Sequence, residues 1–88
     1  MKIKEGFLLR NVGDNHIVVP VGAASVDFRC IITLNDTGAF IWEQLREDCT
    51  MEDVVKAMLT EYDVTVDIAA ADVAAFITAM REKGLLDE

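Results

Sequence analysis

The chain has 88 residues, of which 52% are hydrophobic and one is proline, so it has the composition of one folded domain rather than of a disordered segment. Its formal net charge is −8, and residues 36–88 alone contain four basic and thirteen acidic side chains, a net charge of −9. This acidity argues against nucleic-acid binding, because a protein that binds phosphates needs a basic surface.

The sequence also bears on the cellular compartment. It contains no apolar run near the ~20 residues of a membrane-spanning helix, and residues 1–6 lack the apolar core of a secretory signal. We therefore expect a cytoplasmic protein that does not contact a membrane. The two cysteines, Cys30 and Cys49, lack the spacing of a zinc site, and we expect both to be reduced thiols.

Three strands are predicted in the first part of the chain. Residues 6–12 and 16–21 are largely apolar runs that flank Gly13-Asp14-Asn15, a turn-forming sequence, so they predict a hairpin. The third strand covers residues 26–34. Its alternation places four side chains on one face, which is the better candidate for the core face: Phe28, Cys30, Ile32 and Leu34.

Apolar residues recur every three or four positions after residue 34, which predicts helices. The first helix spans about residues 37–46, is capped by Asn35 or Asp36, and buries Ile41, Trp42 and Leu45. Gly38 lowers its helix propensity by roughly 1 kcal/mol relative to alanine. We interpret this glycine either as a close approach to another backbone or as an unpenalised residue of the first turn.

Two more helices follow. Thr50 is the predicted N-cap of the second, with Glu52 and Asp53 in its first turn, where they complement the helix dipole. Asp67 is the predicted cap of the third helix, and Gly84 is its predicted C′ residue. The buried stripe of the third helix is expected to be Ala69, Val73, Phe76, Ile77 and Met80, and Leu85 and Leu86 should fold back onto the core.

The predicted elements follow the order βββααα over a single domain, residues 1–88. This order is typical of an α+β, winged helix-turn-helix-like fold, in which a three-stranded antiparallel sheet is followed by three helices. A winged helix raises the hypothesis of a DNA-binding regulator. The third helix, however, carries only Arg81 and Lys83 as basic residues, both at its C-terminal end, and few side chains suited to base edges.

The residues offer little for catalysis. The single histidine, His16, stands beside a turn and has the sequence context of an ordinary surface residue. The glycines are isolated, so no phosphate-binding loop is present, and the helical acidic residues fall mainly on polar faces. We expect no enzymatic activity and no bound metal or cofactor.

Peptide or protein binding is the remaining hypothesis. A three-stranded sheet has an open edge, which can accept an extended peptide as a further strand. If the third strand is that edge, the alanines of the third helix would leave a shallow apolar groove beside it. Close packing of these alanines against neighbouring helices is the alternative, and the sequence leaves both open.

A resemblance to a known family narrows this hypothesis. Leu34-Asn35, followed by Gly38, Ile41 and Trp42, resembles the LN-x-x-(A/G)-x-x-(I/L)-W signature of the coenzyme PQQ synthesis protein D (PqqD) family. The agreement continues through four further segments and covers nearly the whole chain: residues 50–55, 62–64, 72–77 and 83–86.

The resemblance implies a peptide chaperone, a recognition element for ribosomally made, post-translationally modified peptides. Such a protein binds the leader of a precursor as an added strand between the third strand and the third helix. It then presents the leader to a maturation enzyme, commonly a radical S-adenosylmethionine (radical SAM) protein, in the synthesis of PQQ or of another product. An accessory subunit without peptide affinity is a further hypothesis, and both a monomer and a homodimer stay open.

The resemblance also implies peptide-binding residues. Carried onto this sequence, the strand side of the cleft consists of Asp27, Phe28, Arg29, Cys30, Ile31 and Ile32. The helix side is drawn from Asp72, Val73, Phe76 and Met80. The implied partners are a leader peptide and a peptide-maturation enzyme, with no nucleic acid, membrane or cofactor.

Overall fold

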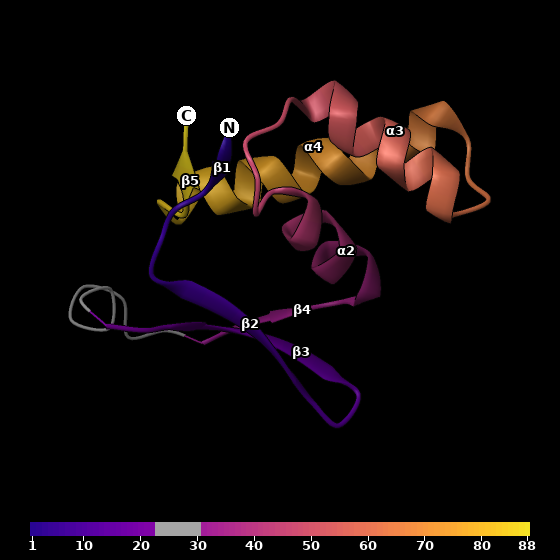
Figure 1. Cartoon of the computed structure of the whole chain (residues 1–88). Coiled ribbons are helices and arrows are strands. Elements are labelled where there is room, and N and C mark those ends of the chain that lie inside the picture. The colour runs from indigo at the N-terminus through magenta and orange to yellow at the C-terminus, as the bar shows by residue number, and fades with distance from the viewer. Residues whose placement is uncertain (23–30) are drawn as a thin grey trace.

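A computed structural model describes residues 1–22 and 31–88 of the chain. Its elements are β1 (Lys2–Ile3), β2 (Phe7–Val12), β3 (Asn15–Pro20), β4 (Ile32–Leu34), α2 (Asp36–Gln44), α3 (Met51–Glu61), α4 (Val66–Glu82) and β5 (Leu86–Asp87). The strands β2, β3 and β4 form an antiparallel sheet, and three helices follow, so the predicted α+β order is confirmed (Figure 1).

The sheet has β3 in its centre, with β2 and β4 on either side. Leu9 of β2 pairs with Val18, and Val18 pairs with Ile32 of β4, so these three side chains form one row across the core face. Ile31 and Thr33 are exposed, as the predicted alternation requires. Residues 26–30 of the predicted third strand, including Phe28 and Cys30, lie outside the described residues.

A second, two-stranded sheet was not predicted. It joins β1 to β5 in antiparallel fashion, with Ile3 opposite Leu86 (Figure 1). The backbone N–H of Ile3 donates to the carbonyl of Leu45 at 2.8 Å, which also ties β1 to the end of α2. The predicted return of Leu85 and Leu86 to the core is confirmed, since both side chains are buried.

The helix termini follow the predicted caps with one exception. The Asn35 side chain caps α2, and Thr50 and Asp53 form a reciprocal capping box at the start of α3. The prediction of Asp67 as the cap of α4 is wrong. The Thr65 hydroxyl accepts the N–H of Ile68 at 3.3 Å, and Asp67 lies in the first turn, where its charge complements the helix dipole.

The C-terminus of α4 ends as predicted at a glycine. Gly84 has a φ of 75°, in the left-handed region, and follows the cap residue Lys83. The N–H of Leu85 donates to the carbonyl of Met80 at 2.9 Å, and that of Gly84 donates to Arg81 at 3.0 Å, the bonding pattern of a Schellman motif. This turn redirects the chain from α4 into β5.

One core lies between the sheet and the three helices (Figure 1). In α2, Ile41 and Trp42 are buried, followed by Leu45 at its C-terminal cap, and α3 contributes Val54 and Met58. The predicted stripe of α4 is buried in full: Ala69, Val73, Phe76, Ile77 and Met80. Among the helices, α2 lies next to this sheet beside β4, and α3 and α4 pack against α2 and each other (Figure 1).

Removal of the α2 cap should measurably destabilise the fold. The Oδ1 atom of Asn35 accepts the N–H of Gly38 at 2.7 Å, so Asn35→Ala leaves a helix N–H unsatisfied. We expect a loss of about 1 kcal/mol in the free energy of unfolding, measured by urea denaturation. Asn35→Asp retains an acceptor and should stay near the wild-type stability; an equal loss in both variants would contradict the cap as the cause.

The α3 capping box predicts a dependence of stability on pH. The Thr50 N–H donates to Asp53 Oδ2 at 3.0 Å, and this backbone hydrogen bond lowers the pKa of Asp53 below its ordinary value of 3.8. A lowered pKa stabilises the fold above the unfolded-state value and ceases to do so as pH falls through the folded-state value. Asp53→Ala should therefore have a lower Tm than wild type at pH 7.

The difference in Tm between Asp53→Ala and the wild-type protein should narrow as the pH falls below 3.8. Circular dichroism melts at a series of pH values would measure it. Asp63→Ala is the matched control, because Asp63 is exposed and accepts no hydrogen bond from the described residues. A gap for Asp53→Ala that stays constant into the acid range would rule out the carboxylate as its source.

Candidate functional site

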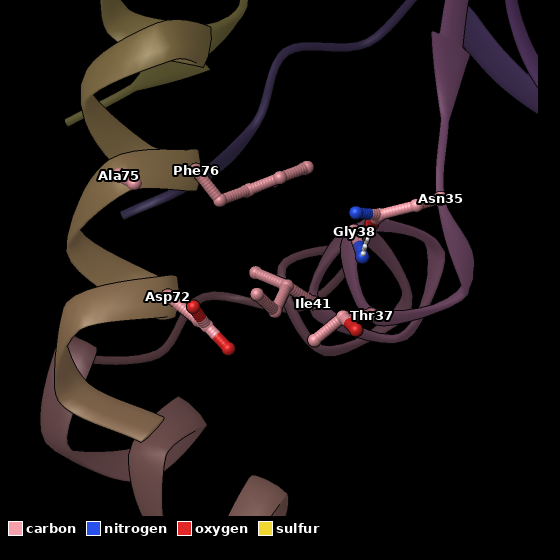
Figure 2. A pocket seen from close by; sticks show the side chains of 7 residues that line it. All are labelled: Asn35, Thr37, Gly38, Ile41, Asp72, Ala75 and Phe76. Carbon is pink, nitrogen blue, oxygen red and sulfur yellow. Dashed lines mark hydrogen bonds between the residues drawn. The ribbon is translucent and has the colours of Figure 1, made fainter. Parts of the chain in front are cut away.

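A cavity of about 310 Å³ lies between the first turns of α2 and the middle of α4, just beyond the end of β4 (Figure 2). Four of its lining residues come from the β4–α2 segment: Asn35, Thr37, Gly38 and Ile41. Three come from α4: Asp72, Ala75 and Phe76. A hollow lined by both apolar and polar side chains is a common form of ligand site.

The apolar part of the cavity depends on Gly38. A Cβ atom at this position would lie 3.1 Å from Asn35 Oδ1 and 3.5 Å from both Leu34 Cβ and Phe76 Cε2. The predicted close approach is therefore real, but the neighbours are side chains rather than another backbone. Only the contact with Asn35 Oδ1 would be tight, so a glycine here keeps the N-cap oxygen undisturbed, while Phe76 lies at ordinary contact distance from this position.

Three polar side chains surround this apolar part. Asn35 uses its Oδ1 atom for the cap, which leaves its amide N–H groups for another acceptor. Thr37 and Asp72 form no side-chain hydrogen bond or ion pair with the described residues. Figure 2 shows the Asp72 carboxylate directed away from α4 into the space in front of Ile41 and Thr37. Among the described residues, Asp72 is the one charged residue that lines this cavity.

The strand β4 leads directly into the cavity wall. It ends at Leu34, and Asn35 caps α2 at the next position. Within the described residues β4 pairs with β3 alone, so its other edge has no strand partner. Ile31, just before β4, is 66% exposed, and an apolar side chain is therefore available beside this edge. An open edge next to a cavity is the geometry in which an extended peptide adds to a sheet.

The structure places the helix-side residues of the predicted cleft in two groups. Asp72 and Phe76 line the cavity. Val73 and Met80, with 0% and 2% exposure, belong to the core face of α4 and lie behind the cavity wall. Their direct contact with a peptide stays a prediction.

The strand-side residues are described only in part. Ile31 is exposed, and Ile32 is half-buried on the core face of β4. Asp27, Phe28, Arg29 and Cys30 lie outside the described residues, so their assignment also stays a prediction.

Several lining residues were not assigned to the site from sequence: Asn35, Thr37, Gly38, Ile41 and Ala75. Asn35, Gly38 and Ile41 had been interpreted as cap, helix and core residues. Ala75 belongs to the alanine-rich part of α4. The sequence left open whether these alanines pack closely against other helices or leave a groove, and the structure contains examples of both. Ala69 is buried by close packing, whereas Ala75 is exposed and opens the cavity. The feature of the sequence that could have indicated these lining residues is the presence of a small residue on each of two helices, Gly38 and Ala75.

The remaining chemistry-bearing groups have structural roles. His16 Nδ1 lies 2.6 Å from Asn11 Oδ1, and His16 Nε2 lies 2.7 Å from Asp36 Oδ1, so this half-buried ring connects the hairpin to the start of α2. The thiol of Cys49 donates to the carbonyl of Gln44 at 3.5 Å, and burial raises its pKa, as in an unreactive thiol.

Residues 1–22 and 31–88 also bear on metal ligation and on membrane spanning. In these ranges the His, Cys, Asp and Glu residues form no group of three that could hold a metal ion. No helix in the same ranges has the length and apolar character required of a membrane span.

Comparisons with known proteins agree on one family and one fold. The family model for "Coenzyme PQQ synthesis protein D (PqqD)" matches residues 25–86. Among solved structures, the chain is similar to "TbiB1 in Complex with the TbiA(beta) Leader Peptide", with a TM-score of 0.76 and 25% identity over 99% of this chain and 95% of that chain. It is also similar to "Lasso peptide synthetase B1 complexed with the leader peptide", with a TM-score of 0.72 and 23% identity over 96% and 93% of the two chains. None of the curated proteins matches the sequence.

Proposed function

The chain belongs to the coenzyme PQQ synthesis protein D (PqqD) family, and from this we propose that it binds the leader segment of a ribosomally synthesised precursor peptide. In this proposal it presents the leader to a separate peptide-modifying enzyme, such as a radical SAM protein, which performs the chemistry. The binding protein contributes recognition and no catalytic group. The proposal places both partners in the cytoplasm, where precursors are made.

The observation that carries this proposal is the likeness to TbiB1, which is held in a solved structure with the TbiA(beta) leader peptide. The likeness extends over 99% of the present chain, so it includes the sheet edge and α4 together. The edge of β4 that has no strand partner among residues 1–22 and 31–88 supports the same binding mode, because a peptide strand there would satisfy backbone groups that β3 does not.

A leader bound in this way would run between β4 and α4. The strand side would be Ile31 and Ile32 together with the preceding Asp27, Phe28, Arg29 and Cys30. On the helix side Asp72 and Phe76 would contact the peptide from the cavity, with Val73 and Met80 supporting them from the core. Backbone hydrogen bonds would provide affinity, and the cavity would select a side chain.

An NMR titration tests this proposal. The probes are synthetic peptides that span the N-terminal parts of short open reading frames beside the gene, each with a scrambled control. We expect one of them to shift amide resonances of residues 31–41 and 68–80, which surround the cavity. Absence of shifts with every peptide, or shifts confined to residues 12–16 and 51–61, would contradict the proposed site.

A further inference from the structure

We propose that the cavity between α2 and α4 selects a basic residue of the leader peptide, with its aliphatic stem on Ala75 and Phe76 and its charged head at the Asp72 carboxylate. This inference rests on the proposed function and adds the chemical class of the side chain that the cavity takes. Asp72 would then be the specificity-determining residue of the site.

The first argument concerns the carboxylate itself. Asp72 lines the cavity without an ion pair or hydrogen bond from the described residues, whereas three other helical acids, Glu43, Glu52 and Asp53, have partners nearby. Figure 2 shows its oxygens pointing into the hollow rather than along the surface of α4. A carboxylate at the edge of the hollow, without a partner among the described residues, would repel an acidic side chain. A purely apolar side chain would desolvate it without compensation.

The second argument concerns the shape and composition of the hollow. Ala75 and Phe76 provide an apolar surface near the Asp72 oxygens, and the buried side chain of Ile41 also lines the hollow (Figure 2). Lysine and arginine have this same combination, because their methylene stems bury against apolar surface while the charged head remains at a polar edge. A cation near the Phe76 ring would also benefit from the ring's negative face.

The third argument is the charge around the site. Residues 36–88, which form all three helices, carry a net charge of −9. This field attracts a cationic leader segment and speeds its association before any direct contact forms. Thr37 and the amide of Asn35, on the opposite side of the hollow, are available for the leader backbone or for a guanidinium-bound water.

A double-mutant cycle tests the pairing directly. The probe is the flanking-gene peptide that binds in the titration, together with variants in which each of its Lys or Arg residues is changed singly to Met. Asp72→Asn should weaken binding of the unmodified peptide by about five- to tenfold at the same salt concentration as the control variant below. One Met variant should weaken binding to the wild-type protein by a similar factor and should cause no further loss with Asp72→Asn.

Asp67→Asn is the matched control. Asp67 is exposed on the same helix and its removal changes the net charge equally, but it does not line the cavity. We expect less than a twofold change in affinity for this variant at 150 mM salt, where long-range attraction is screened.

The outcomes separate this inference from the function on which it rests. A peptide that shifts the cavity residues but contains no Lys or Arg would overturn the basic-residue inference and leave peptide binding intact. The basic-residue inference would also be overturned if no basic residue of the peptide showed coupling to Asp72, or if Asp67→Asn weakened peptide binding as much as Asp72→Asn. Failure of every peptide to bind would overturn the proposed function and this inference with it.

Discussion

Replacing Ala75 with tryptophan should weaken leader binding by roughly 100-fold, or about 2.7 kcal/mol, and leave the fold intact. Ala75 lines the cavity, and its side chain is exposed. An indole attached there would occupy the space in front of Ile41 and Phe76 that a leader side chain requires. Because the site is on the solvent side of α4, no core packing is lost, and the stability should change by about 0.5 kcal/mol or less.

Ala71→Trp is the control for this prediction. Ala71 is exposed on the preceding turn of α4 but does not line the cavity, so the same substitution adds equal bulk at a different place. Calorimetric titration with the flanking-gene peptide would give both affinities, and urea unfolding would give both stabilities. Equal affinities for the two variants would mean that the peptide does not enter the cavity.

Replacing Trp42 with alanine should cost about 3–5 kcal/mol of the free energy of unfolding. Its side chain is 2% exposed and lies in the core between the sheet and the helices. A domain of this size has roughly 4–13 kcal/mol of stability in total, so the variant should unfold at a much lower urea concentration or fail to fold at 37 °C. Removal of the indole leaves a cavity that the surrounding side chains fill only in part.

Circular dichroism during urea unfolding would measure this loss, since the variant lacks the only tryptophan and its fluorescence. Trp42→Phe retains an aromatic ring in the same place and should lose roughly half as much stability or less. If Trp42→Ala unfolds at the wild-type urea concentration, the core does not depend on this side chain.

The helices and their caps were predictable because each depends on residues that are close together in the sequence. The 3–4 spacing of apolar residues identified the core stripe of α4 from Ala69 to Met80 in full. Asn35 and Gly84 were predicted at the two kinds of helix terminus, because a cap depends on side-chain oxygens or on a positive φ within a few residues.

The predictions failed where two neighbouring residues could both cap a helix, or where a strand pairs with a strand far away in the sequence. Thr65 and Asp67 are both good N-cap residues, and the structure uses Thr65 as the cap and Asp67 in the first turn. The strands β1 and β5 are too short to produce a periodic pattern in the sequence. They form because the two ends of the chain pair with each other, with Ile3 opposite Leu86.

The functional site shows the same division. The family-like segment around Leu34 and Trp42 and the acidic character of the helices are properties of the sequence, and they led to the prediction of peptide binding rather than DNA binding. Which side chains form the cavity was decided by tertiary structure. Gly38 and Ala75 line the same cavity from two helices, Phe76 lies against the start of α2, and Asp72 is left without a partner among the described residues. Local patterns determine which face of an element is apolar, but the space between two elements depends on how they pack, and that involves residues far apart in the sequence.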